Sequence, residues 1–246
     1  MTDLKNKTAI VTGSSKGLGK KIAIELATHG ANVVVNYNSN EADAQATVHE
    51  ILSNGGNAFA VKADVSNSEE VNNLFEEAIE HFGKVDIIVN NAGIMETKFL
   101  KDFSEEEFDK QFSINVKSVF LMMKKASEKL EQNGRIINIS SSTSRLMMPA
   151  YAIYSATKSA VEQMTRVFAK EIGSKGITVN AVLPGPINTE LFLKGKSEDL
   201  INRVAGLSAF NRIGNVEDII PVILFLSSTE AQWITGQSIG INGGMA

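Results

Sequence analysis

The sequence predicts an α/β protein built on one doubly wound parallel sheet of about seven strands, with helices on both faces. Short runs rich in Val, Ile and Thr alternate with helix-like segments from one end of the chain to the other. Strands this uniformly apolar are typical of parallel sheets, which are buried on both faces. Right-handed crossovers between such strands give the doubly wound arrangement. The 246 residues contain no repeat and no flexible linker, so we expect a single domain over residues 1–246.

The strands are expected where β-branched residues cluster, and a helical pattern follows most of them. The expected strands are Thr8–Thr12, Asn32–Tyr37, Ala58–Val61, Val85–Val89, Arg135–Ile139, Thr178–Val182 and Ser238–Ile241. The helical segments that stand out are Gly17–His29, Glu41–Leu52, Tyr154–Ile172 and Val216–Leu226.

Capping boxes indicate where two further helices begin. Ser66 is followed three residues later by Glu69, and apolar residues from Val71 to Ile79 then recur at helical spacing. Ser104 and Glu107 form the same pattern ahead of a long helix that we expect to reach about Leu130.

One segment interrupts this rhythm, between Pro184 and Arg212. It carries two prolines and three glycines directly after a predicted strand. Ligands of doubly wound sheets bind beyond the carboxyl ends of the strands. We therefore interpret residues 184–212 as an insertion that covers a substrate, and expect limited proteolysis to cleave it in the ligand-free protein.

Composition excludes several classes of function. The chain contains no cysteine, which removes disulfides, thiolate catalysis and cysteine-based zinc sites. A formal net charge of −4 without a basic cluster predicts no nucleic-acid partner. The N-terminus is polar and the apolar run Ile219–Leu226 is too short to span a bilayer, so we expect a cytoplasmic protein with no membrane partner. No metal site is expected from the three histidines, which are His29, His49 and His81.

A glycine-rich turn follows the first expected strand. Gly13, Gly17 and Gly19 give the spacing G-x-x-x-G-x-G. Gly13 permits a tight turn, and the other two leave room for a pyrophosphate at the N-terminus of the next helix. The alternative is an ordinary turn between a strand and a helix. The second strand contains Asn36 near its end, where sites for NAD carry an acidic residue, and Lys16 is able to pair with a 2′-phosphate. These features favour NADP(H), with NAD(H) as the alternative.

Tyr154 and Lys158 stand four residues apart on a predicted helix and therefore share one face. A phenol titrates near pH 10, and a nearby cation stabilises the phenolate that proton transfer leaves behind. Ser140, Ser141 and Ser142 end the fifth strand at the edge of the sheet where cofactor and substrate would meet. A polar strand end and a helix-surface pair are the plainer alternatives for these residues.

Together these segments resemble the compact branch of the short-chain dehydrogenase/reductase family, over nearly the whole chain. The similarity is greatest to 3-oxoacyl-carrier-protein reductases and glucose-dehydrogenase-like members, which have a Rossmann-like fold. It rests on the motifs Thr12–Gly19, Asp64, Asn90–Gly93, Asn115, the serine after Ile136–Ile139, Tyr154–Lys158, Pro184-Gly185, Ile234–Gln237 and Gly243-Gly244.

The resemblance implies roles for individual residues. Tyr154 would be the general acid in reduction and the base in oxidation, and Lys158 would lower its pKa and hold the nicotinamide ribose. The catalytic serine of such proteins lies thirteen residues before the tyrosine, which selects Ser141. Asn115 would support a water that leads to Lys158.

The same resemblance implies the cofactor contacts. Asp64 would bind the adenine, Asn91 the adenosine ribose region, and Ile187 and Thr189 the nicotinamide amide. The full set of expected cofactor residues is Gly13, Ser15, Lys16, Gly17, Leu18, Gly19, Asn36, Asn38, Ser39, Asp64, Val65, Asn91, Ala92, Gly93, Tyr154, Lys158, Pro184, Gly185, Ile187 and Thr189.

Three functions remain open on the sequence. The first is an NADP-dependent reductase of ketones or 3-oxoacyl groups, and the second is an NAD(P)-dependent sugar or polyol dehydrogenase. The third is a nucleotide-sensing protein without turnover, against which the intact Ser141, Tyr154 and Lys158 set argues. Apolar residues near the expected site favour an uncharged carbonyl or alcohol substrate; they are Met95, Met147, Met148, Tyr151, Ile187, Leu191 and Phe192. By resemblance, we expect a homotetramer.

Overall fold

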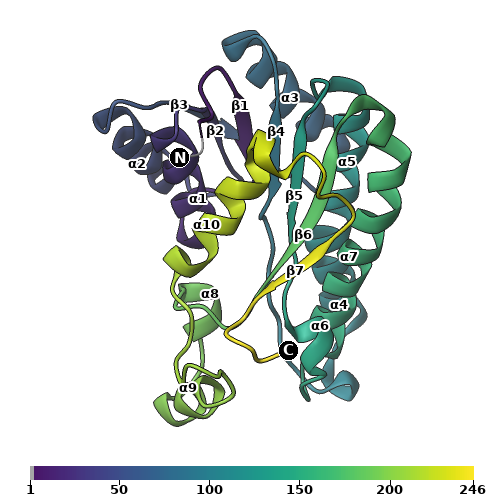
Figure 1. Cartoon of the computed structure of the whole chain (residues 1–246). Helices are drawn as coiled ribbons and strands as arrows, with labels where there is room; N and C mark the ends of the chain where they lie inside the picture. The colour runs from purple at the N-terminus through teal and green to yellow at the C-terminus, as the bar shows by residue number, and fades with distance from the viewer. Residues whose placement is uncertain (1–2) are drawn as a thin grey trace.

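The computed structural model describes residues 3–246 and contains a seven-stranded parallel sheet in the order β3-β2-β1-β4-β5-β6-β7 (Figure 1). The fold class predicted from the sequence is confirmed. The strands are β1 (Thr8–Val11), β2 (Asn32–Tyr37), β3 (Asn57–Lys62), β4 (Ile87–Asn90), β5 (Arg135–Ile139), β6 (Thr178–Pro184) and β7 (Ser238–Ile241).

Two layers of helices cover the sheet. The helices are α1 (Gly17–Thr28), α2 (Glu41–Ser53), α3 (Ser68–Phe82), α4 (Glu105–Phe112), α5 (Ser118–Lys129), α6 (Thr143–Leu146), α7 (Ala152–Ile172), α8 (Glu190–Leu193), α9 (Glu198–Ala205) and α10 (Val216–Ser227). Helices α1, α2 and α10 pack on one face of the sheet, and α3, α5 and α7 on the other (Figure 1).

The alternation of side chains along each strand divides the core into two parts. Val33 and Val35 of β2 face the α1 side, whereas Val34 between them faces the α3 side. All three side chains are fully buried, which is why the strands read as unbroken apolar runs.

The order of the strands reverses between β1 and β4. The chain runs from β1 outward to β2 and β3, then returns to place β4 on the other side of β1. A crevice forms at such a switch point, beyond the carboxyl ends of the strands, and dinucleotides bind there in doubly wound folds. The glycine turn after β1 and the Asn-rich turn after β4 both open into it.

Two local predictions are corrected by the structure. The N-cap of α3 is Asn67 and not Ser66, because the Asn67 side chain accepts from the backbone of Glu69 and Glu70 while the Ser66 hydroxyl donates to Asp64. The long helix predicted from Ser104 does begin with its capping box, but a π-helical turn over Ser113–Lys117 separates α4 from α5.

The predicted insertion lies between β6 and α10 and contains α8 and α9. Figure 1 shows these two helices beyond the end of α10, away from the sheet. Its two ends meet at a neck, where the Asn188 N–H donates to the Gly214 carbonyl at 2.9 Å and the Gly214 N–H to the Pro186 carbonyl at 2.8 Å. Residues 188–213 are called the insertion below. Among residues 3–246, no helix combines the length and the apolar character needed to cross a membrane.

Candidate active site

The glycine turn after β1 is shaped by close packing against the turn after β4. Gly13 has a φ of +61°, which favours glycine, and a Cβ there would lie 3.0 Å from the Ala92 Cα. A Cβ on Gly19 would collide with the Asn91 amide and the Gly13 carbonyl. Within the described chain, no side chain caps the first turn of α1, so its N–H groups stay available to an anion.

Asn91 and Thr12 clamp the ends of β1 and β4 together. The Asn91 amide donates to the carbonyls of Thr12 at 2.9 Å and Gly13 at 3.0 Å. In return, the Thr12 hydroxyl accepts from the backbone N–H groups of Asn91 and Ala92. The side chain that was predicted to contact the cofactor therefore also holds the glycine turn in place.

Asn36 points into the protein, and sequence reasoning missed its structural role. It is 2% exposed, and its carbonyl oxygen accepts from the Gly13 N–H at 3.1 Å. Its amide nitrogen donates to the Ala63 carbonyl at 3.0 Å. Asn36 thus shapes the glycine turn from behind and is occupied by protein partners, whereas Asn38 and Ser39, just beyond β2, are exposed.

Lys16 is paired with a residue of the insertion that the sequence did not single out. Its ammonium group lies 2.8 Å from a carboxylate oxygen of Glu190, the first residue of α8. The side chains are 63% and 73% exposed, so this ion pair is a surface contact between the glycine turn and the insertion. Lys16 remains able to turn toward a phosphate, because solvent-exposed pairs exchange partners at little cost.

Asp64 and Val65 follow β3 on the far side of the glycine turn. The Asp64 carboxylate accepts from both the backbone N–H and the hydroxyl of Ser66, at 2.9 and 2.7 Å. Its own N–H donates to Glu70 at 2.7 Å. Val65 is buried in the core on the α3 side. The half-buried carboxylate is therefore held in one orientation at the edge of the crevice.

Tyr154 and Lys158 lie one turn apart on α7 and are both buried. The Lys158 ammonium lies 5.7 Å from the centre of the Tyr154 ring and donates to the Ile139 carbonyl at 2.8 Å. Burial raises the pKa of Tyr154 to about 12, against the effect of a hydrogen bond with Ser141. Burial also lowers the pKa of Lys158 to about 8. At pH 7 the phenol is therefore protonated and the lysine mostly charged.

The three serines after β5 have different partners. The Ser141 hydroxyl lies near Tyr154, whose pKa it lowers against the effect of burial, and accepts from the Thr143 N–H at 3.2 Å. The Ser142 hydroxyl donates to the Leu183 carbonyl at 3.2 Å. Ser140 points to α7, where its hydroxyl lies 3.1 Å from Glu162. The structure thus brings Ser141 to Tyr154, as the spacing of the sequence suggested.

Asn115 lies in the π-helical turn and joins the loop after β4 to α7. Its side chain accepts from the Ile94 N–H at 2.8 Å and donates to the Ile94 carbonyl at 2.9 Å. It also donates to the Thr157 hydroxyl at 3.2 Å. A Cβ built on Gly93 would lie 3.3 Å from the Asn115 side chain and 3.7 Å from the Lys158 ammonium. Four elements therefore converge on one buried group of Asn115, Ser141, Tyr154 and Lys158, which is called the buried floor below.

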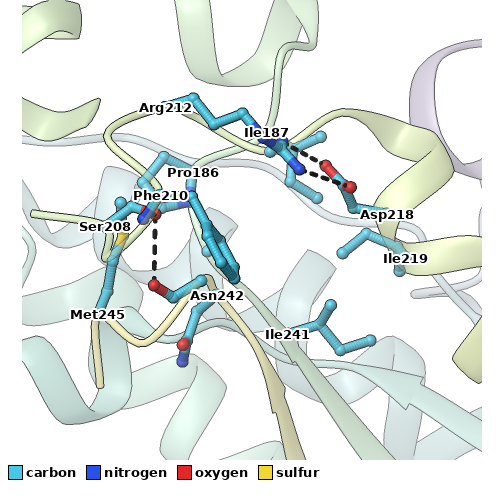
Figure 2. Close-up of a pocket in the computed structure, with 13 residues that line it drawn as sticks. Pro186, Ile187, Ser208, Phe210, Arg212, Asp218, Ile219, Ile241, Asn242 and Met245 are labelled. Carbon is cyan, nitrogen blue, oxygen red and sulfur yellow. Dashed lines mark hydrogen bonds and ion pairs between the residues drawn. The ribbon is translucent and has the colours of Figure 1, made fainter. Parts of the chain in front are cut away.

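The segment after β6 lines a small hollow. Ile187 is buried, and the Thr189 hydroxyl caps α8. Behind Ile187 lies a hollow of about 190 Å³, over which Arg212 and Asp218 are joined by hydrogen bonds of 2.6 and 2.9 Å (Figure 2). This pairing holds the pKa of Asp218 at about 2. The hollow is smaller than the roughly 300–1,000 Å³ of usual ligand sites.

The apolar residues expected around the substrate are only partly in the core. Met147 is 84% exposed and Leu191 is 49% exposed. Met95, Met148 and Tyr151 are half-buried. One exposed and two half-buried methionines suit an adaptable apolar wall, because thioethers adjust to irregular shapes.

Comparison with known proteins places this arrangement in a family. A family model described as enoyl-(acyl carrier protein) reductase matches residues 13–246. An NADPH-dependent aldehyde reductase-like protein of Arabidopsis thaliana, described as chloroplastic, is 42% identical, over 98% of this chain and 94% of that protein. A short-chain type dehydrogenase/reductase of Picea abies is 41% identical, over 98% and 93%.

A solved structure shows the same architecture with a nucleotide. The putative dehydrogenase of Burkholderia cenocepacia with bound NADP superposes with a TM-score of 0.95 at 35% identity, covering 100% of this chain and 96% of that one. The match spans the glycine turn, the buried floor and the insertion together. On these similarities of sequence and structure, the chain belongs to the short-chain dehydrogenase/reductase family and is an oxidoreductase.

Proposed function

We propose that this protein is an NADPH-dependent carbonyl reductase that converts ketone or 3-oxoacyl groups into secondary alcohols. The observation that carries the proposal is the buried contact of Ser141 with Tyr154, next to the Lys158 ammonium. A phenol is protonated at pH 7, and burial raises the pKa of Tyr154 further, to about 12. Tyr154 therefore has a proton to donate to a carbonyl oxygen. The relative from Arabidopsis thaliana, described as an NADPH-dependent aldehyde reductase-like protein, supports the same direction.

Each residue of the floor has a distinct task in this proposal. Tyr154 donates its proton to the carbonyl oxygen as negative charge develops there, and Ser141 donates a hydrogen bond to the same oxygen. Lys158 places a positive charge beside the phenolate that proton transfer leaves behind. Asn115 fixes the loop at Ile94, which forms the neighbouring wall. NADPH, when bound, supplies the hydride.

The residues around the glycine turn suit a dinucleotide with a 2′-phosphate. The uncapped first turn of α1 offers free N–H groups for the pyrophosphate, and nothing lies within 4 Å of a Cβ built on Gly17. No carboxylate follows β2 at Asn38 or Ser39 to repel a 2′-phosphate. Lys16 supplies a cation once it leaves Glu190. The NADP in the Burkholderia cenocepacia relative supports this assignment.

We also propose that the insertion forms a lid over the substrate and that the subunits assemble into a tetramer. Exposed apolar side chains lie on the outer surfaces of α4, α5 and α7 at Phe108, Phe120 and Val167. Trp233, which is 95% exposed, lies shortly before the edge strand β7. Surfaces of this kind are typical of contacts between subunits. Sedimentation velocity tests the assembly, and a monomer at micromolar concentration would contradict it.

The experiment that tests the function is a pair of titrations followed by an assay. Nicotinamide fluorescence is followed as NADPH and NADH are added, and turnover is then measured with ketones and 3-oxoacyl thioesters. Tight binding of NADPH together with ketone reduction is the expected result. Preference for NADH with sugar or alcohol oxidation would contradict the proposal. Binding of nucleotide without any turnover would point to a sensor.

A further inference from the structure

Glu162 is a buried carboxylate for which the proposed mechanism has no task. It lies one turn beyond Lys158 on α7, on the same stripe of the helix as Tyr154 and Lys158, and is 5% exposed. Burying a carboxylate is unfavourable unless hydrogen bonds compensate the loss of water. The partners that supply this compensation are therefore informative about what Glu162 does.

Two hydroxyl groups donate to the same oxygen of Glu162. The Ser140 hydroxyl lies 3.1 Å from Oε1 and the Ser144 hydroxyl lies 2.6 Å from it. The other oxygen faces the Arg166 guanidinium at 3.8 Å, on a side chain that is 49% exposed. Glu162 thus reaches from α7 to the segment that carries Ser141, at Ser140 just before Ser141 and at Ser144 in α6, three residues after it.

Each of the two hydroxyls has a competing acceptor. Ser140 lies 3.2 Å from the Lys158 carbonyl, and Ser144 lies 2.9 Å from the Ser141 carbonyl. A hydroxyl has a single proton to donate, and a carboxylate is the stronger acceptor. With Glu162 present, both protons are drawn toward α7. Without it, Ser144 would donate to the Ser141 carbonyl within its own segment and lose its link to α7, while Ser140 would still reach α7 through the Lys158 carbonyl.

We propose that Glu162 is a positioning residue that holds the Ser141 hydroxyl at its place beside Tyr154. By pulling on Ser140 and Ser144, it fixes the turn that carries Ser141 to the helix that carries Tyr154. Glu162 touches neither substrate nor cofactor in this role and acts through Ser141. The inference rests on the proposed function, because it takes Ser141 to be the hydrogen-bond donor to the substrate oxygen.

A double-mutant cycle tests the inference. Glu162→Ala is expected to lower the single-turnover rate about tenfold while KM for the ketone and the Kd for NADPH stay within twofold, since a misplaced donor weakens the transition state most. In the Ser141→Ala background, the same substitution should have no further effect. Enzyme in excess keeps the residual rate of Ser141→Ala measurable.

Two further variants distinguish the positioning of Ser141 from an effect of the Glu162 charge and from a failure of the variant to fold. Glu162→Gln keeps an oxygen that accepts from Ser140 and Ser144, although a weaker one than a carboxylate, so its rate should lie between those of the wild type and Glu162→Ala. An equal loss in Glu162→Gln and Glu162→Ala would overturn the inference. Ser144→Ala removes one of the two links without leaving a buried cavity. It should lower the rate about threefold, again only when Ser141 is present, and serves if Glu162→Ala does not fold.

Thr165→Val is the matched control on the same helix. Thr165 is fully buried and bonded to Asn138 and to the Val161 carbonyl, away from the turn after β5. It should lower the Tm and leave the rate unchanged. A rate loss in Glu162→Ala that adds fully to that of Ser141→Ala would overturn the role of Glu162. An unchanged rate in Ser141→Ala would instead overturn the proposed function, so the two failures are distinguishable.

Discussion

The buried floor and the insertion differ in how they are held. The residues of the floor, which are Asn115, Ser141, Tyr154 and Lys158, are each at most 8% exposed. Hydrogen bonds join Asn115 to Thr157 of α7 and Lys158 to the last residue of β5. The insertion exposes large apolar side chains and is tied down at its neck, at the Arg212–Asp218 and Lys16–Glu190 pairs, and by bonds from Ser208 and Ala209 to the Gly243 carbonyl.

This contrast separates the two tasks of the site. Groups that transfer a proton need fixed geometry, which a network of buried hydrogen bonds supplies. A surface that admits substrate and cofactor has to open, which few and exposed contacts permit. Substitutions in the floor should therefore change the rate or the stability strongly, whereas substitutions in the insertion should change binding slightly.

The largest effect is expected at Tyr154. Tyr154→Phe removes the proton donor and keeps the ring, so turnover should fall about a thousandfold while the Kd for NADPH changes less than twofold. Stopped-flow turnover and fluorescence titration measure the two quantities. Tyr151→Phe is the matched control, since its ring lies 6.4 Å from that of Tyr154, and it should cost less than fivefold. Comparable losses in both variants would contradict the assignment of Tyr154 as the proton donor.

Lys158 should show that the floor is maintained at the expense of stability. Its pKa is about 8 in the folded protein, against 10.5 for the free side chain. The unfolded chain therefore holds the proton more tightly, and burying the charged lysine destabilises the fold at neutral pH. Lys158→Met should raise the free energy of unfolding by about 1–3 kcal/mol at pH 7 while turnover is lost.

The pH dependence identifies the cause of this gain. The wild type should recover the difference as pH rises from about 8 toward 10.5, because the folded lysine is then neutral while the unfolded one still binds a proton. Urea unfolding at pH 7 and pH 9.5 measures the gap between wild type and Lys158→Met. A gap that is the same at both values would show that packing, and not the buried charge, is responsible.

Gly19 tests the clamp between the glycine turn and the end of β4. A Cβ there meets the Asn91 amide and the Gly13 carbonyl, so Gly19→Ala has to push apart the clamp between β1 and β4. We expect about tenfold weaker NADPH binding and a destabilisation of about 1–3 kcal/mol. Gly173→Ala is the control, since nothing lies within 4 Å of a Cβ built at that position. Equal Tm values for the two variants would contradict the close approach at Gly19.

Features set by neighbouring residues were predictable from the sequence. The strands and helices follow from runs of apolar residues and from local caps such as Ser104 with Glu107, where both partners lie within four residues. The stripe of Tyr154 and Lys158 follows from helix periodicity alone. The capping prediction at Ser66 was wrong because Asp64 competes for its hydroxyl, and a capping pattern does not include such competitors.

Features set by distant residues were not predictable. Asn36 looks like a free side chain at a strand end, but the carbonyl of Ala63 and the N–H of Gly13 bury it. The partners of Glu162 lie 22 and 18 residues away from it along the chain. Lys16 and Glu190, which pair with each other, lie 174 residues apart. Such pairs depend on the packing of β5 against α7 or of the insertion against α1, which no local pattern records.

The smallest effect is expected at the contact between the two regions, the pair of Lys16 and Glu190. Glu190→Gln releases Lys16 for a 2′-phosphate, so the Kd for NADPH should fall about two- to fourfold, as expected for an exposed ion pair. The Kd for NADH should not change, because that cofactor carries no 2′-phosphate. Glu198→Gln is the matched control, since it removes an exposed charge from α9 of the same insertion.

Salt and protease separate the release of Lys16 from a general change in charge. At 0.5 M salt the advantage of Glu190→Gln should disappear, because mobile ions screen the exposed pair in the wild type as well. Without nucleotide, the insertion of Glu190→Gln should be cleaved faster than that of Glu198→Gln, since one of its few attachments is gone. Equal tightening for NADPH and NADH would mean that Glu190 acts on the insertion as a whole and not through Lys16. In that case the Lys16–Glu190 pair would not be the contact through which the insertion affects cofactor binding.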